Sequence, residues 1–415
     1  MIITACNPAV RSEDRRVSTA TSPAPISSTP SLPVAQAGND RLMSLDALRG
    51  FDMFIITGGK GLLIGLATML AAKGWLVTEA GVAKLTKELT HPQWNGFTFY
   101  DLIYPLFIFL VGVALPFSLS KRIERGESKA RLYWRICRRT ALLVLLGMIC
   151  TNKLLLFDFS DLRYVSVLEK IGLAYFFAAI ITLHTSARGR IAWIAAILVG
   201  YWAALMFIPA PGVVPGKFDV PGATLTDYVD RTVLPGKLIH QHVDNDPNLQ
   251  YARDPEGLLS TIAAVATALF GVLAGQWLRD SQRSGPVKAL ALLVAGLCCL
   301  GLGGLWDVWL PINKNLWTSS FTLWCAGWSL LLMGLFYLVI DVWGWRKWAF
   351  FFVVIGMNAI TIYALKESGV DFEAVGKLLF SRSPIAKELL LPFGSIAVEW
   401  FFLYVLYRSR IFLRL

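Results

Sequence analysis

The stretch FYDLIYPLFIFLVGVALPFSL, residues 99–119, has one charged side chain, Asp101, among its 21 residues. A helix needs about 20 mostly apolar residues to cross the hydrocarbon core of a bilayer, so this stretch predicts a transmembrane helix. The segment that follows it, KRIERGESKARLYWRICRR at 121–139, is strongly basic. Because basic loops between apolar helices stay on the cytoplasmic side, the two stretches together predict a membrane protein and its orientation.

The composition of the whole chain agrees with this class. Of its 415 residues, 55% are hydrophobic and 16% are charged. A soluble domain carries roughly 25% charged residues, and a disordered chain combines low hydrophobicity with high net charge. We therefore predict an all-α polytopic integral membrane protein with ten transmembrane helices, over 46–70, 99–119, 137–151, 165–183, 191–208, 258–278, 287–307, 318–340, 348–365 and 393–407.

The distribution of lysine and arginine orients these helices. With both termini in the cytoplasm, most basic clusters fall in cytoplasmic segments, as the positive-inside rule requires. These clusters account for the net charge of +11, which does not indicate a nucleic-acid partner. Residues 1–40, rich in Ser, Thr, Pro and Ala, are expected to be a disordered tail, and 41–415 the membrane domain. The longest outer segment, 209–257, is expected to form an ordered cap over a pocket mouth.

Several charges lie inside predicted spans, where an ionised side chain costs on the order of 3 kcal/mol. Asp46 and Arg49 are three residues apart in the first span, so they share a helix face and can form an ion pair. Asp101 stands in the second span and Lys170 in the fourth. We interpret Asp46, Arg49 and Asp101 as functional or as direct supports of function, and Lys170 as structural.

His91 is the strongest single candidate for chemistry. It begins the motif HPQWNG, 91–96, just before the second span on the outer face. Imidazole changes its charge near neutral pH, so it can act as a base, an acid or an acyl carrier. From the residues alone, a structural histidine at the interface remains the alternative. The pair His240 and His242 lacks a third ligand at a suitable spacing, so we expect no metal site.

Two further outer segments, PINKNLW at 311–317 and DPEG at 254–257, gather polar side chains. Amide groups beside an aromatic face are what a sugar site uses, and acids at a helix start can bind an amine. A plain connector is the alternative for the first segment, and helix capping is the alternative for the second. The candidates in these two segments are Asn313, Lys314, Asn315, Trp317, Asp254 and Glu256.

Taken together, these motifs resemble the heparan-α-glucosaminide N-acetyltransferase family and its bacterial NagX-like members. The motifs that carry the resemblance are SLDALRG at 44–50, HPQWNGFT at 91–98, DLIYP at 101–105, DPEGL at 254–258, PINKNLW at 311–317 and GMNAI at 356–360. The resemblance covers about 41–415. The first motif is shared with other membrane acyltransferases, whereas the whole set in this order is specific.

The resemblance implies acetyl transfer from acetyl-CoA, bound from the cytoplasmic side, to the amine of glucosamine or a glucosaminide on the other side. It also implies that His91 is the catalytic histidine, that the protein lies in the bacterial inner membrane, and that it forms a homodimer. Two positions depart from the family. The segment 56–60 has no asparagine where the family has a functional one, and 168–170 reads LEK instead of a Gln-Arg pair.

On this interpretation His91 accepts the proton of the attacking amine, and fixed donors stabilise the tetrahedral oxyanion. The candidate donors, in falling order, are Asn315, Asn313, Lys314 and Asn358. The groups expected to hold CoA are Asp46, Arg49, Lys121, Arg122, Arg135, Arg138 and Arg139. The groups expected to hold the sugar are Asp101, Trp94, Asn95, Asp254, Glu256, Lys314, Trp317 and Asn358.

Alternatives remain for the reaction path and for the class of function. We expect direct transfer in a ternary complex, and a covalent acetyl-His91 intermediate with ping-pong kinetics is the alternative. A proton-coupled amino-sugar transporter would fit the same composition, but it would need no CoA. A non-catalytic membrane scaffold would need neither His91 nor the polar turn at 313–315.

Overall fold

The computed structural model describes residues 42–152, 162–239, 253–370, 372, 374 and 390–413. Within these ranges the chain is helical and forms no strand beyond two isolated bridges, which confirms the predicted fold class. Seven helical segments are long and apolar enough to cross a membrane, so the chain is a multi-pass membrane protein. They are α1–η1–α2 (Met43–Phe54, Ile55–Gly59, Lys60–Ala72), α4 (Phe99–Glu124), α6 (Val167–His184), α7 (Ala187–Phe207), α9 (Leu258–Arg279), α10 (Gly285–Trp306) and α11–η3 (Ser319–Phe336, Tyr337–Val342).

An eighth candidate span is broken. The helices α12 (Ala349–Met357) and α13 (Ala359–Glu367) meet at Asn358 and are bent by 65°. The third and tenth predicted spans coincide with α5 (Lys129–Asn152) and α15 (Leu390–Arg408), which are not among the seven. The first half of α5 carries five basic side chains, which lowers its apolar character. The number of ten spans and the cytoplasmic position of the termini stay predictions.

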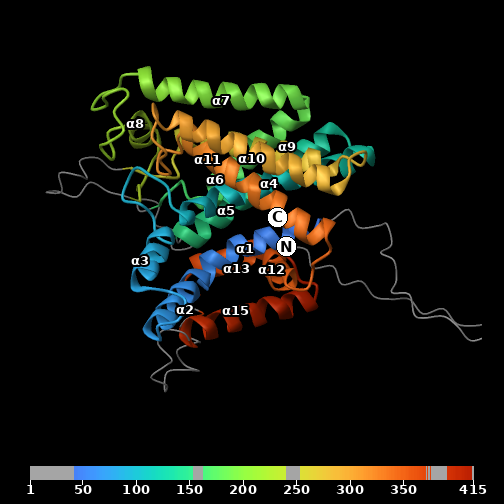
Figure 1. Ribbon diagram of the computed structural model, residues 1–415. Coiled ribbons are helices and arrows are strands. Elements are labelled where there is room, and N and C mark those ends of the chain that lie inside the picture. The colour runs from blue at the N-terminus through green and yellow to red at the C-terminus, as the bar shows by residue number, and fades with distance from the viewer. Residues whose placement is uncertain are drawn as a thin grey trace, which may run out of the picture. The chain divides into compact units, whose positions relative to one another are not determined.

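The helices α4 and α9 lie side by side and pack closely against each other (Figure 1). A Cβ added at Gly112 of α4 would lie 2.0 Å from the carbonyl oxygen of Ala268, and one at Gly271 of α9 would lie 2.0 Å from that of Phe109. Small residues allow two backbones to approach this closely in a membrane. The two helices run in parallel, so the start of α9 lies at the same end as Asp101 of α4.

Glycines also hold α1 against α12. A Cβ at Gly50 would lie 1.7 Å from the carbonyl oxygen of Phe352, and one at Gly356 would lie 1.9 Å from that of Asp46. This contact gives the glycines of the SLDALRG and GMNAI motifs a packing role. Directly after the contact, α1 passes through the π-helical turn η1 and α12 ends at the break, so both chains change direction near the same place.

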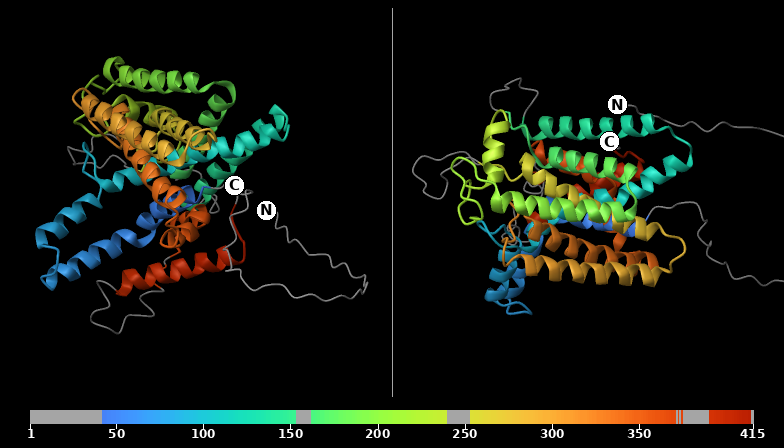
Figure 2. Two further views of the ribbon diagram at one scale, coloured as in Figure 1. Left: turned by 45° about the vertical axis from the view of Figure 1, so that its right-hand side comes forward. Right: turned by 90° about the horizontal axis from the view of Figure 1, so that it is seen from above.

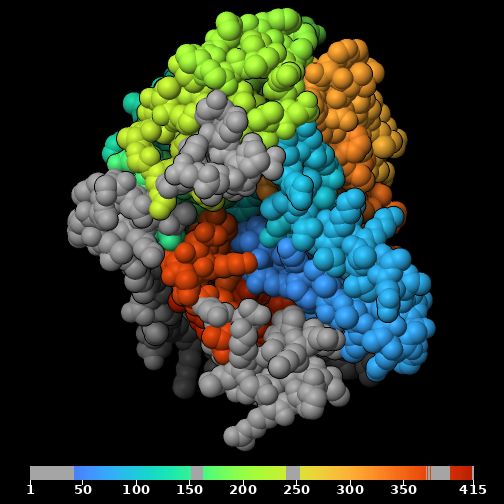
Figure 3. Space-filling model, turned by 90° about the vertical axis from the view of Figure 1, so that its left-hand side faces the viewer, coloured from blue at the N-terminus to red at the C-terminus, as the bar shows by residue number. Residues whose placement is uncertain are grey.

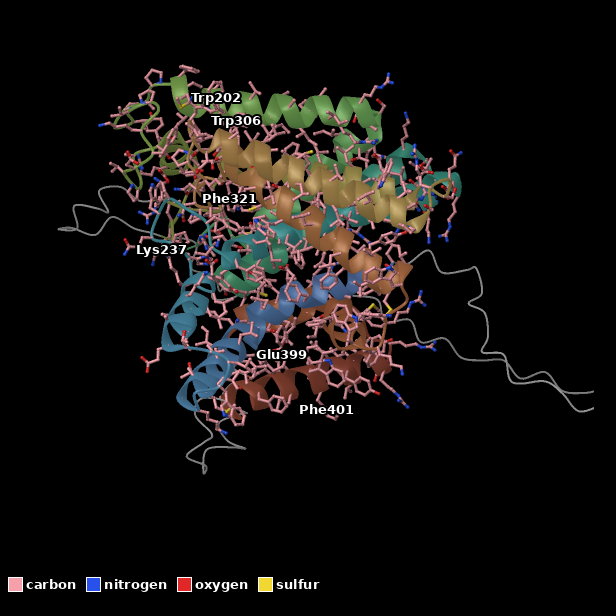
Figure 4. The ribbon with its side chains drawn as sticks, viewed as in Figure 1. Trp202, Lys237, Trp306, Phe321, Glu399 and Phe401 are labelled. Carbon is pink, nitrogen blue, oxygen red and sulfur yellow. The ribbon has the colours of Figure 1, made fainter. Side chains whose placement is uncertain are left out.

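The remaining helices flank this centre on two sides. In Figures 1 and 2, α7, α10 and α11 lie on one side of α4 and α9, and α1, α13 and α15 lie on the other. Trp202 of α7 contacts Trp306 of α10 with ring centroids 6.2 Å apart, which joins the outermost helix to its neighbour (Figure 4). These side layers leave the interior between α1, α4, α6 and α13 for a cavity.

The connecting segments at the end of the molecule that carries His91 include two short helices, α3 (Glu79–Glu88) and α8 (Leu225–Val233). The described part of the predicted cap, 209–239 with 253–257, packs onto the membrane domain. The indole nitrogen of Trp94 donates to the carbonyl oxygen of Phe218 at 2.6 Å. His240 and His242 lie outside the described residues.

We predict that Gly271→Ala destabilises the protein because the new methyl group must displace the backbone of α4. Overpacking of this kind costs about 1–3 kcal/mol, so the thermal unfolding temperature in detergent should fall. The control is Gly200→Ala in α7, where an added Cβ meets nothing within 4 Å. An equal unfolding temperature for Gly271→Ala and the wild type would show that the α4–α9 contact is not tight.

Candidate functional site

The loop that carries His91 is fixed at two points between α3 and α4. The hydroxyl of Thr98 donates to the carbonyl oxygen of Thr90 at 2.7 Å, which closes the loop. The backbone amide of Gly96 donates to the carbonyl oxygen of Ile312 at 2.8 Å, and its φ of 114° favours glycine. The His91 loop is therefore tied both to the start of α4 and to the 311–317 turn.

Asp101 orients the imidazole of His91. The Oδ1 atom of Asp101 lies 2.6 Å from Nδ1 of His91, and its Oδ2 atom accepts a hydrogen bond from the amide of Thr98 at 3.1 Å. The Asp101 side chain is fully buried, whereas the His91 side chain is 47% exposed. Because an ionised carboxylate only accepts hydrogen bonds, Nδ1 carries the proton and Nε2 keeps its lone pair.

Lys314 stands against the same imidazole. Its ammonium nitrogen lies 3.1 Å from Nε2 of His91 and 3.7 Å from Oδ1 of Asp101. Burial lowers the pKa of Lys314, and the neighbouring Asp101 carboxylate opposes this shift. The three side chains come from the α3–α4 loop, the first turn of α4 and the 311–317 turn. They bring a base, the imidazole of His91, and a cation, the ammonium of Lys314, next to each other.

A cavity of about 320 Å³ opens at His91 and runs inward along α4. Its walls are mostly apolar and aromatic, and Glu256, Lys314 and Glu367 supply charge. The surface is hollowed where α13, α1–α2 and the α3–α4 loop meet (Figure 3). The lining residues are Met53, Ile56, His91, Tyr100, Ile103, Tyr104, Phe107, Val167, Leu168, Ile171, Glu256, Lys314, Ile360, Tyr363 and Glu367.

The groups predicted to hold CoA lie at the opposite end of α4. Lys121 is about 30 Å along the helix from Asp101, whereas the deepest α4 residue in the cavity wall, Phe107, is about 9 Å away. The predicted pair of Arg49 and Asp46 is confirmed, with 3.7 Å between Nη1 and Oδ1. None of the groups predicted to hold CoA lines the cavity.

Most of the basic groups at this end already have protein contacts. Arg122 and Arg135 both pair with Glu127, at 3.4 Å and 3.2 Å. Arg139 lies over the ring of Tyr175, 4.5 Å from its centroid, and Arg138 is exposed. Their role in binding CoA stays a prediction.

The amides at the mouth join loops to one another. The side chain of Asn313 donates to Oδ1 of Asn95 at 2.9 Å and accepts from the amide of Leu316 at 3.1 Å. Asn95 also donates to the carbonyl oxygen of Phe218 at 3.3 Å, which Trp94 shares. None of Trp94, Asn95 and Asn313 lines the cavity, so we assign them to positioning of the His91 loop.

Asn315 and Asn358 also lie outside the cavity wall. Asn315 is half-buried in the 311–317 turn. Asn358 is buried at the break between α12 and α13, and its side-chain nitrogen and oxygen have no hydrogen-bond partner in the structure.

Trp317 is buried and supports Lys170. Its ring is 1% exposed, so it presents no face on which a sugar could stack. The ammonium of Lys170 lies 4.1 Å from the ring centroid and donates to the carbonyl oxygen of Pro255 and to the hydroxyl of Ser260, both at 2.9 Å. Lys170 is thus a structural cation, as the sequence indicated, and it holds the start of α9 beside the cavity.

The DPEG segment forms a buried ion cluster with Arg163. The guanidinium of Arg163 donates to both oxygens of Asp254, at 2.7 Å and 2.5 Å, and also bonds Glu256. Burial raises the pKa of Glu256, and the charge of Arg163 opposes this shift. The Asp254 side chain is fully buried in its ion pair with Arg163. Glu256 binds the same guanidinium and also lines the cavity.

Sequence reasoning missed several residues of the site. Tyr100, Tyr104 and Tyr363 line the cavity, and Arg163 neutralises the acids at its mouth. Tyr104 lies inside the DLIYP motif, so the motif itself pointed to it. A single arginine at 163 next to an apolar span was a second signal, because such a charge needs a partner.

The chain is also similar to proteins that are already known. Residues 41–155 match the family model described as a domain of unknown function, DUF5009. The chain is 30% identical over 370 residues to heparan-alpha-glucosaminide N-acetyltransferase of Mus musculus. This match covers 78% of the present chain and 56% of the relative. It is 28% identical over 367 residues to the protein of the same name from Homo sapiens, with 78% and 55% covered. The chain is homologous to these proteins and spans about half of their length.

We predict that Arg163→Met destabilises the protein because it leaves two buried carboxylates without their cation. Breaking a buried pair in this way costs about 3–5 kcal/mol. Without Arg163, burial alone acts on Glu256 and raises its pKa, so this carboxyl ionises at a cost as pH rises and is neutral at low pH. The loss of thermal stability should be larger at pH 8 than at pH 5.

The control is Arg188→Met, which removes an exposed guanidinium from the start of α7. Its unfolding temperature should match the wild type at both pH values. A loss for Arg163→Met that is independent of pH would contradict the assignment of the cluster.

Proposed function

Starting from this homology, we propose that the protein is a transmembrane acetyltransferase. It moves an acetyl group from acetyl-CoA on the cytoplasmic side to the amine of glucosamine or a glucosaminide on the other side. The observation that supports this most strongly is His91, which is oriented by a buried carboxylate and partly exposed at the mouth of an apolar cavity. We place the protein in the bacterial inner membrane, as a homodimer.

The reaction uses His91 as a general base. The amine of the acceptor attacks the thioester carbonyl, and Nε2 of His91 accepts the proton that the nitrogen loses. The new C–N bond forms, the C–S bond breaks, and the proton passes from His91 to the thiolate of CoA. Asp101 stabilises the imidazolium between these steps, and general base catalysis of this kind contributes about 10²- to 10⁴-fold.

Lys314 and Glu256 act on the charges of the two reactants. The Lys314 ammonium lies 3.1 Å from Nε2 of His91, so it can stabilise an oxyanion that forms beside that nitrogen. Glu256 brings negative charge to the same cavity wall, where it would hold the ammonium form of the acceptor before deprotonation. In this arrangement Lys314 takes the role for which the asparagines were the first candidates.

The apolar wall suits the arm of the donor. Met53, Phe107 and Ile171 line the inner part of the cavity and offer no charge to compete with the thioester. The basic groups at the far end of α4 would hold the CoA phosphates. Between Phe107 and Arg122 the arm must cross about 22 Å along the helix.

The first test is acetyl-CoA-dependent N-acetylation of glucosamine by the purified protein. We predict that His91→Ala abolishes the activity and that Asp101→Asn lowers it by about 10²- to 10⁴-fold, because the imidazole loses its orienting charge. The matched control is His184→Ala, which removes an imidazole bonded to Tyr133 at 2.6 Å, away from the cavity.

Activity that survives His91→Ala, or is lost equally in His184→Ala, would contradict the proposal. Uptake of glucosamine into vesicles without CoA, unaffected by His91→Ala, would identify a transporter instead. Acetylated enzyme recovered after incubation with the donor alone would establish the covalent path through His91 and exclude direct transfer.

We further predict that Lys314→Met lowers kcat by about 10²- to 10³-fold with little change in KM for acetyl-CoA, since the ammonium acts on the developing charge. Lys314→Arg keeps the cation and should retain part of the activity. Steady-state kinetics with both substrates varied measures these parameters. A rise in KM alone would show that Lys314 only binds substrate.

A further inference from the structure

A second cavity of about 590 Å³ lies beside the first and has no part in the reaction described above. It is lined by η1 and the start of α2, by the end of α13 and the chain that follows it, and by the first half of α15. Ile56 and Tyr100 belong to the walls of both cavities. The two spaces are therefore neighbours, separated by these two side chains.

Tyr100 divides the two cavities. The ring centroids of Tyr100 and His91 are 4.8 Å apart. The ammonium of Lys60 lies 4.8 Å from the same Tyr100 centroid, on the wall of the second cavity. A group bound at Lys60 would thus be one aromatic ring away from the candidate base.

The charged groups of the second cavity favour an anion. Lys60 and Lys366 both line it, and Glu399 is the carboxylate among its lining residues. Glu399 is 4% exposed, makes a hydrogen bond with Thr57, and lies on the face of α15 that points toward α1–α2 (Figure 4). The ammonium of Lys366 donates to the carbonyl oxygen of Ile56 in the π-helical turn. With two lysines and one glutamate, the charged side chains that line this cavity have a formal net charge of one positive unit.

Apart from glycines and the polar side chains of Thr57, Tyr100 and Ser395, the rest of the lining is apolar. The apolar lining residues are Ile55, Ile56, Ile64, Ile362, Val370 and Phe372. Beside them, Leu63 and Leu66 of α2 and Phe393 of α15 are exposed. Because α2 belongs to a membrane-spanning segment, this edge of the cavity is in reach of lipid.

We propose that the second cavity binds an anionic amphiphile that enters from the bilayer. Its phosphate is held by Lys60 and Lys366, and its hydrocarbon chain packs against Ile64, Ile362 and Phe372. Ammonium groups bind phosphate through charge-assisted hydrogen bonds, which are strong at a site shielded from water. The same chemistry fits a bilayer phospholipid and a polyprenyl phosphate, and the experiment below distinguishes them.

The test is native mass spectrometry of the detergent-purified protein, titrated separately with phosphatidylglycerol, a polyprenyl phosphate and phosphatidylcholine. The wild type should bind an anionic lipid, and phosphatidylcholine should bind less well. The double variant Lys60→Gln/Lys366→Gln should bind the anionic lipid with an affinity lower by tenfold or more. The control is Lys84→Gln/Lys217→Gln, which removes the same charge from two exposed positions at the outer end and should leave binding unchanged.

A second variant tests the apolar part of the site, which is proposed to hold the hydrocarbon chain of the lipid. Ile64→Trp fills the apolar part and keeps both lysines, so it should also weaken lipid binding. The tighter of the two anionic ligands identifies the source, and either result supports the proposal. Equal affinity for phosphatidylglycerol and phosphatidylcholine, or an equal loss in both double variants, would overturn it. The readout does not depend on activity, so it stands apart from the test of His91.

Discussion

One buried carboxylate, Asp101, links the fold to the site. Its Oδ2 atom caps the first turn of α4, and its Oδ1 atom holds the imidazole of His91. The side chain has no contact with water, so it depends on these partners and on the nearby Lys314 for its stability. The helix that crosses the centre of the molecule and the base at the mouth of the cavity are therefore fixed by the same group.

This constraint explains why the surrounding parts are arranged as they are. The parallel contact of α4 with α9 brings Glu256 to the level of Asp101, and the Asn95–Asn313 hydrogen bond brings Lys314 to His91. Below them the cavity is apolar, which suits an acyl donor and keeps water from the thioester. The proposed chemistry depends on this arrangement, in which charged groups surround the mouth of the cavity and apolar side chains line its inner part.

Much of this could be predicted from the sequence, and the failures have physical causes. The length of an apolar stretch predicts most spans because it is a local property of the sequence. The basic first half of α5 and the break at Asn358 make the number of spans uncertain to predict in this way. The motifs pointed to His91 and Asp101, but not to their mutual contact. Arg163 and its partner Asp254 are 91 positions apart, and Trp317 is buried under Lys170 by packing alone. Local sequence indicates that a charge beside an apolar span needs a partner, but it does not identify the partner.

The central claim is that an acetyl group moves from a donor on one side of the membrane to an amine on the other, at His91. It is tested most directly in sealed proteoliposomes with labelled acetyl-CoA outside and glucosamine trapped inside. The account predicts labelled N-acetylglucosamine inside the vesicles with the wild type and none with His91→Ala. Product that forms only when both substrates share one compartment would contradict it.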